Sequence, residues 1–259
     1  MAQRAWISSL SPNKEAAASL IQTLASYGIN ATGHIWDDDL DQLGWMGPRD
    51  EIVHPDTGMW IILDHEAMLE RKSVRYGLSL LILTVMANRG SSFPLILINA
   101  NGTPVDQETL PTMMKGLDSL CTTDASLGAK LVAFMHTKHK ATPPEYYADV
   151  YGNPHIGQWF EIGPMDGIWN GAMFAVDSGE IAFHAAGPRG VLPEKATMEY
   201  PVKEAKIQFG QREYTAWACQ NNLTRDESYF VQAKGHPDSI LFGPFSQSDE
   251  AEVFILDLV

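Results

Sequence analysis

The residues most able to do chemistry begin with four aspartates in the segment 34–45, at Asp37, Asp38, Asp39 and Asp41. Carboxylates this close repel one another unless a cation, a helix N-terminus or solvent compensates. Their order, Asp-x-Asp-x-Asp, matches the opening of an EF-hand calcium loop, which continues with glycine at its sixth position and glutamate at its twelfth. This sequence has Gln42 and Pro48 at those positions. We therefore expect no metal site here.

Further polar residues follow short apolar runs that predict strands, at 4–10, 30–36 and 59–63. Strands separated by helical patterns indicate a parallel sheet, and ligands of such sheets gather at the carboxyl ends of the strands. Ser11 and the serines before it could also form a small anion-binding lip beside a helix N-terminus. The expected ligand-binding residues at these ends are Ser8, Ser9, Trp36, Asp37, Asp38, Asp39 and Asp64.

The remaining elements of the first half complete this arrangement. A helix is expected over 11–28, with Ser11 as its N-cap, Pro12 in its first turn and Gly28 at its end. A long helix follows at about 65–88, then a strand at 94–100, a short helix at 107–119 and a fifth strand at 128–135. The fold class predicted is α/β, with a five-stranded parallel, doubly wound sheet of the flavodoxin kind.

The second half has a different pattern. Three hairpins are expected, over 172–187, 205–220 and 229–245, which indicates an antiparallel sandwich or barrel. The last segment, 246–259, favours a helix only slightly over a strand. The predicted domains are an α/β domain at 1–140, a proline-containing linker at 141–157 and an antiparallel β-rich domain at 158–259.

Composition narrows the functional classes. The net charge of −14 disfavours nucleic-acid binding, which requires a basic face. The two cysteines form neither a disulfide framework nor a zinc motif. The most apolar run, 77–87, is about half the ~20 residues needed to span a bilayer, and the N-terminus does not resemble a signal peptide. We expect a cytoplasmic protein that binds neither membrane nor nucleic acid.

The first half resembles a TIR (Toll/interleukin-1 receptor homology) domain over roughly residues 4–138. The resemblance rests on a first strand ending in serines, on a helix with the pattern A-x-x-L-x-x-x-L-x-x-x-G, and on an acidic loop after the second strand. The loop comprises residues 36–40 with Gly44. The helix residues are Ala17, Leu20, Leu24 and Gly28.

The resemblance implies a nucleotide pocket beside the acidic loop, with NAD or another nucleotide as the ligand. TIR domains that cleave NAD carry a glutamate in the helix after the third strand, and Tyr76 occupies the corresponding position here. We therefore expect binding rather than hydrolysis. Glu70 and Asp64 are the candidate acid–base residues. Arg75, which is expected to face the acidic loop, and Tyr76 are the remaining expected ligand-binding residues.

Four functions stay open. The leading hypothesis is a signalling or sensing protein that binds a nucleotide-like ligand or a protein partner at the strand ends. The second is an enzyme that acts on a nucleotide or sugar substrate between the two domains. The third is a scaffold that forms homo-oligomers through the α/β domain. The fourth is a receiver-like phosphorelay domain, with Asp64 as the acceptor but with serines where receivers carry an acidic pair.

Overall fold

The computed structural model describes residues 4–102, 105–137, 144–195, 197–245 and 252–259. The chain divides into two compact units. Unit 1 comprises residues 1–110 and 114–142, and unit 2 comprises residues 111–113 and 143–259. Within the described residues, no helix combines the length and apolarity needed to cross a membrane.

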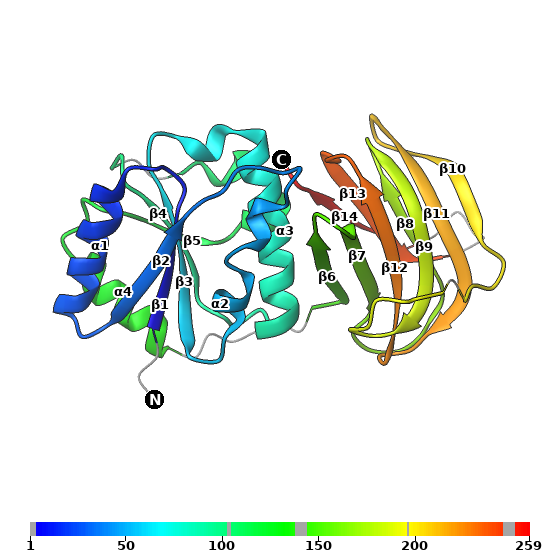
Figure 1. The fold of residues 1–259 in the computed structure, drawn as a ribbon, viewed down its shortest axis with the longest axis horizontal. Coiled ribbons are helices and arrows are strands. Elements are labelled where there is room, and N and C mark those ends of the chain that lie inside the picture. The colour runs from blue at the N-terminus through cyan, green and yellow to red at the C-terminus, as the bar shows by residue number, and fades with distance from the viewer. Residues whose placement is uncertain (1–3, 103–104, 138–143, 196, 246–251) are drawn as a thin grey trace. The chain divides into compact units, whose positions relative to one another are not determined.

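Unit 1 is built on a five-stranded sheet in which all neighbouring strands are parallel, in the order β2-β1-β3-β4-β5 (Figure 1). The strands are β1 (Arg4–Ser9), β2 (Asn30–Ile35), β3 (Thr57–Asp64), β4 (Leu95–Asn99) and β5 (Asp118–Cys121). The three central strands are almost wholly buried, as expected for a parallel sheet covered on both faces. This confirms the parallel α/β sheet predicted for the first half of the chain.

Helices cover both faces of this sheet (Figure 1). The helices are α1 (Lys14–Ser26), α2 (Arg49–Val53), α3 (Lys72–Arg89) and α4 (Leu127–His136), with short 3-10 turns at η1 (Gly44–Met46), η2 (Met68–Glu70), η3 (Gln107–Thr109) and η4 (Thr112–Met114). Helices α1 and α4 pack on one face, where Leu20, Leu24 and Leu131 join a buried cluster with Ile7, Ile61 and Ile98 of the strands. Helices α2 and α3 cover the other face.

The expected strand at 128–135 and the expected helix at 107–119 were both wrong. The first segment is helix α4, and its buried residues Leu127, Leu131 and Met135 recur every four positions, which is the period of a helix. The second contains the two short turns η3 and η4 and runs into β5, the true fifth strand. Only four residues long and partly exposed, β5 offers little periodicity to detect.

Two helices also begin at residues other than those predicted. Asn13, not Ser11, caps α1, since its side chain accepts a hydrogen bond of 2.9 Å from the backbone N–H of Glu15. The long helix begins at Lys72 rather than near residue 65, because Glu66 and Ala67 adopt left-handed backbone angles and Arg71 is extended. A helix cannot run through left-handed residues.

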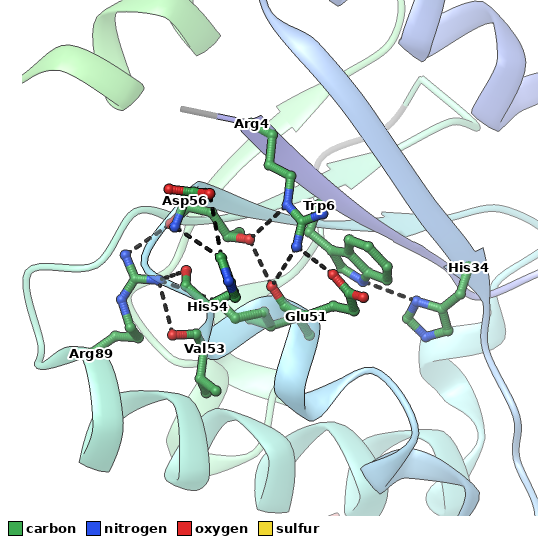
Figure 2. A network of polar contacts seen from close by, with 10 residues as sticks. Arg4, Trp6, His34, Glu51, Val53, His54, Asp56 and Arg89 are labelled. Atoms are coloured by element: carbon green, nitrogen blue, oxygen red, sulfur yellow. Dashed lines mark hydrogen bonds and ion pairs between the residues drawn. The ribbon is translucent and has the colours of Figure 1, made fainter. Parts of the chain in front are cut away.

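A polar network ties the amino ends of β1 and β3 to the neighbouring helices (Figure 2). The guanidinium of Arg4 donates to Thr57 Oγ1 at 3.2 Å and forms an ion pair with Glu51 of α2. Arg89, at the end of α3, donates to the carbonyl oxygens of His54 and Thr57 at 2.5 and 2.8 Å. This end of the sheet is therefore held by structural contacts.

Unit 2 contains two antiparallel sheets, which confirms the β-rich second half. One has the order β10-β11-β8-β13-β14 and the other β6-β7-β12-β9. They face each other as a sandwich, with Phe160 and Phe174 in ring contact at 4.9 Å and His184 and Trp217 at 4.7 Å. The strands are β6 (Tyr146–Asn153), β7 (Gly157–Pro164), β8 (Trp169–Val176), β9 (Glu180–Pro188), β10 (Val202–Phe209), β11 (Arg212–Leu223), β12 (Glu227–Lys234), β13 (Ser239–Pro244) and β14 (Phe254–Asp257).

Of the three expected hairpins, only 205–220 is one, formed by β10 and β11. In the segments 172–187 and 229–245 the chain turns sharply, but it passes from one sheet to the other, so β8 does not pair with β9 and β12 does not pair with β13. The turn signal is local, whereas the choice of partner strand depends on the whole sandwich.

Two further expectations in this half were wrong. The segment expected as a linker, 141–157, contains strand β6, which pairs with β7 along its whole length. The last segment ends in strand β14 rather than in a helix, because it completes the sheet beside β13. Residues 246–251 of that segment lie outside the described residues.

Candidate functional site

A cavity of about 240 Å³ opens at the carboxyl edge of the parallel sheet, beside α1 and the start of α4. It lies where β3, β4 and β5 end, because its lining includes His65, Ala100 and Thr122, which directly follow those three strands. The wall from α1 and α4 consists of Ala16, Ser19, Leu20, Thr23 and Leu127. This edge is where α/β sheets place their ligands.

The lining of the cavity combines hydroxyl groups, one imidazole and two leucines. Thr23 Oγ1 donates to the Ser19 carbonyl at 3.0 Å and Thr122 Oγ1 donates to the Ala100 carbonyl at 3.3 Å. Each hydroxyl oxygen therefore keeps lone pairs for a ligand donor. The lining contains no carboxylate, lysine or arginine. A neutral ring with polar edges would suit these surroundings.

The turn that positions His65 is strained. Glu66 and Ala67 have φ angles of 65° and 55°, in the region that non-glycine residues rarely adopt. Each such residue costs on the order of 1–3 kcal/mol, and such strain collects at functional sites. The turn is anchored by Ser11, whose Oγ donates to Glu66 Oε2 at 3.2 Å.

Asp64 lies at the base of the same turn but does not line the cavity. Its side chain is buried, and Oδ1 accepts a hydrogen bond of 3.3 Å from the backbone N–H of Leu69. Burial raises the pKa of Asp64, and the neighbouring Glu70 raises it further, against the backbone hydrogen bonds. Glu70 itself is exposed at the end of η2. Asp64 therefore holds a proton more readily than a solvated aspartate does.

The two serines at the end of β1 are committed to internal contacts. Ser8 is fully buried, and its Oγ accepts a hydrogen bond of 2.9 Å from Trp60 Nε1. Ser9 is also buried and donates to the Ser11 carbonyl at 3.1 Å. The lip of free hydroxyls that the sequence suggests therefore does not form in this structure.

The aspartate loop, residues 37–41 within the acidic loop, stabilises its own turns. Asp37 Oδ1 accepts from the Asp39 backbone N–H at 3.1 Å, and Asp39 Oδ1 accepts from the Gln42 N–H at 3.0 Å. Both side chains are exposed, so solvent screens their repulsion. In the part of the chain that the structure describes, no three His, Cys, Asp or Glu side chains come together in a way that could hold a metal ion.

Asp38 differs from its neighbours because it points to the first turn of α3. Its Oδ2 accepts a hydrogen bond of 2.8 Å from Ser73 Oγ, and the N-cap residue Arg71 provides no side-chain cap. Beside it, Trp36 and Trp45 pack against Gly77. Asp38 Oδ1 and the indole Nε1 atoms of both tryptophans are buried without a hydrogen-bond partner among the described residues.

Arg75 and Tyr76 both lie in the first half of α3. Arg75 donates to the carbonyl oxygens of Leu69 at 2.5 Å and Thr109 at 2.8 Å, so it ties two loops together. Tyr76 is buried, and its side chain does not reach solvent. These two hydrogen bonds of Arg75 go to carbonyl oxygens outside the aspartate loop.

Sequence reasoning missed the cavity residues His65, Ser19, Thr23 and Thr122. One signal was present, since His65 directly follows a strand that ends at the ligand-binding edge. The residues on α1 carried no signal, because small polar residues on a helix surface are common. The known protein families and curated proteins give no further guide, since no family model and no curated protein matches this chain significantly.

Proposed function

We propose that unit 1 binds a small nucleotide-like ligand at the carboxyl edge of its sheet, in a signalling or sensing role. The observation that carries this proposal is the cavity at the ends of β3, β4 and β5, lined by His65 and three hydroxyl-bearing side chains. Its lining can accept hydrogen bonds from a heterocycle while the two leucines contact the ring face.

The finer classification of unit 1 as flavodoxin-like or TIR-like belongs to the same proposal. The strand order 2-1-3-4-5 is that of flavodoxin-like sheets and supports it. The helix pattern of α1 and the acidic loop after β2 add the resemblance to TIR domains. On this basis the ligand is NAD or another nucleotide, and the protein acts in the cytoplasm through a protein partner or a homo-oligomer.

The size of the cavity limits what it can take. Sites for drug-sized ligands occupy roughly 300–1,000 Å³. At about 240 Å³, this cavity accommodates a single ring system, and the phosphates of a nucleotide would extend outside it. We infer that the recognised part is the base or the nicotinamide ring.

The proposal is tested by calorimetric titration with NAD, nicotinamide mononucleotide, AMP and GMP. We expect at least one of them to bind, and binding to weaken about tenfold or more when Thr122→Phe fills the cavity. That loss corresponds to at least about 1.4 kcal/mol of binding free energy. His65→Ala should weaken binding as well.

The matched control is His54→Ala. His54 precedes the same strand β3 but stands at its amino end, in the structural network of Figure 2. The His54→Ala variant should bind nucleotides as tightly as the wild type does. If no nucleotide binds to the folded protein, or if Thr122→Phe binds as tightly as the wild type, the proposed site is incorrect.

A second candidate function is acid–base catalysis, and Asp64 favours it. Its raised pKa and its position beside a strained turn are both common in active sites. Because Asp64 does not line the cavity, it would act through the adjacent His65, which does. Asp64→Asn should then lower turnover of a bound nucleotide while leaving its dissociation constant within about twofold, because an amide keeps the hydrogen bond but cannot exchange the proton. Release of nicotinamide from NAD is the first reaction to assay.

A further inference from the structure

Strand β2 forms one edge of the parallel sheet and is exposed along its length. In the described part of the chain, β2 pairs with β1 on one side and with no strand on the other. Four of its six residues are exposed and the other two are half-buried, whereas β1, β3 and β4 are almost wholly buried. An exposed edge of this kind is a template for another strand.

The direction of the backbone groups on β2 follows from one hydrogen bond. Trp36 N–H, just after the strand, donates to the Ser9 carbonyl of β1 at 2.8 Å. Groups that point to the same side recur at every second residue of a strand. The N–H and C=O groups of Ala31, Gly33 and Ile35 therefore point away from β1, toward the open edge.

The usual protections of an edge strand are missing from β2. Its sequence, NATGHI, contains no lysine, no acidic residue and no proline. Burial lowers the pKa of His34 to about 4, so the strand carries no charge at neutral pH. Ile35 is 41% exposed, and Tyr27, shortly before the strand, is 48% exposed.

We propose that β2 pairs with β2 of a second copy of this chain, in antiparallel orientation, around a two-fold axis at Gly33. In this register Gly33 lies opposite Gly33 of the second copy, and Ala31 lies opposite Ile35 of the second copy. The three outward-facing residues of each strand then exchange about six hydrogen bonds, because each opposed pair exchanges two. The result is one continuous sheet across two subunits.

Charge selects this orientation. The antiparallel register places Asp37 opposite Ile29 of the second copy, so the two aspartate loops lie at opposite ends of the paired strands. They are then separated by about eight residues, or roughly 27 Å, which exceeds the screening length of about 8 Å at physiological salt. A parallel pairing would bring the two loops together. A partner strand from another protein would not gain the matched two-fold register around Gly33.

Gly33 itself is not a suitable position for a test substitution. A Cβ at this position would lie 2.0 Å from the carbonyl oxygen of Ile7, so any other residue would disturb the sheet within one subunit. Ile35→Lys avoids this problem, because the side chain of Ile35 is already exposed. A lysine there keeps the fold and opposes strand pairing.

Sedimentation velocity over a concentration series is the first test. The wild type should show a concentration-dependent dimer, and Ile35→Lys should remain monomeric at concentrations where the wild type is at least half dimeric. Phe209→Lys, which replaces a 51% exposed apolar residue of unit 2, should dimerise as the wild type does. A wild type that stays monomeric up to millimolar concentration, or a dimer insensitive to Ile35→Lys, overturns the proposal.

Disulfide trapping tests the register. In a Cys121→Ser background, Ala31→Cys and Ile35→Cys proteins are prepared separately and oxidised alone or as a mixture. Opposed residues of a hydrogen-bonded antiparallel pair have Cα atoms about 5.5 Å apart, within the range for a disulfide. The mixture should therefore form a cross-linked dimer, and each protein alone should not. Cross-linking of each single protein with itself would indicate parallel pairing and would refute the proposed interface.

Discussion

The carboxylate of Asp38 and the hydroxyl of Ser73, 35 positions apart in the chain, are joined by a hydrogen bond of 2.8 Å. This contact connects the aspartate loop to the first turn of α3. The helix has no side-chain cap of its own, so Asp38 places its negative charge where the helix dipole is positive. One aspartate of the cluster is thus stabilised by the fold, and the exposed ones are stabilised by solvent.

Removing this contact should destabilise unit 1. We expect Asp38→Ala to lower the free energy of unfolding by about 1 kcal/mol, as loss of an N-cap does. Ser73→Ala alone should lower the free energy of unfolding by a smaller amount. The double variant should lose less stability than the sum of the losses of the two single variants. Urea unfolding of the four proteins measures this coupling. Asp50→Ala, which removes an exposed aspartate of α2, should change stability by less than about 0.5 kcal/mol.

Gly77 should tolerate no larger residue. A Cβ there would lie 2.9 Å from Trp45 Cβ and 3.0 Å from Trp36 Cζ2, and both indoles are buried. We expect Gly77→Ala to cost about 1–3 kcal/mol of stability through overpacking, measured by thermal or urea unfolding.

Gly128, also within a helix, is the matched control for Gly77. The three atoms nearest to a Cβ at Gly128 would be ring atoms of Tyr27, at 2.2, 2.4 and 2.8 Å, and this ring is 48% exposed and can rotate away. Gly128→Ala should therefore be neutral or slightly stabilising, since alanine favours helix by up to about 1 kcal/mol. Equal losses for both variants would contradict the packing argument.

Arg89 should contribute more to stability than the exposed cations do. It donates to the carbonyl oxygens of His54 and Thr57, and its removal would leave those groups without this donor. Arg89→Ala should cost about 1–3 kcal/mol in urea unfolding. Lys130→Ala breaks the surface ion pair with Asp124 and should cost less than Arg89→Ala, because solvent screens such pairs. The reverse order would show that the network of Figure 2 is dispensable.

The stability of unit 2 should depend on pH through His184. Burial, with a smaller contribution from Lys203, lowers the pKa of His184 from 6.5 to about 4. The unfolded chain therefore binds this proton more readily than the folded chain. Stability is fully present above pH 6.5 and falls as the pH drops toward 4, by up to about 3 kcal/mol.

Urea unfolding at several pH values, followed by tryptophan fluorescence, measures this slope. His184→Gln should flatten it, because glutamine can still bond the hydroxyl of Tyr229, which lies 2.6 Å from His184 Nδ1, but does not titrate. An unchanged slope in His184→Gln would assign the pH dependence to other groups. His34, whose pKa is lowered to about 4 as well, is the corresponding contributor in unit 1.

Several elements were predictable because their signals are local. The first four parallel strands follow from apolar runs between helical patterns, and the β10–β11 hairpin follows from two strands joined by a short turn. The segment 128–135 shows the limit of such signals. Its apolar residues fit a buried strand or a helix, and only the position of the sheet selected the helix.

The sequence by itself determined that β3 ends in an aspartate, which a histidine follows, and that four aspartates follow β2. The tertiary structure alone decided that His65 lines a cavity, that Asp64 is buried beside it, and that Asp38 reaches Ser73 while its neighbours face solvent. It also decided which strands pair across the two sheets of unit 2. The physical reason is the same throughout: local sequence sets backbone preference, whereas burial and contact depend on residues far away in the chain.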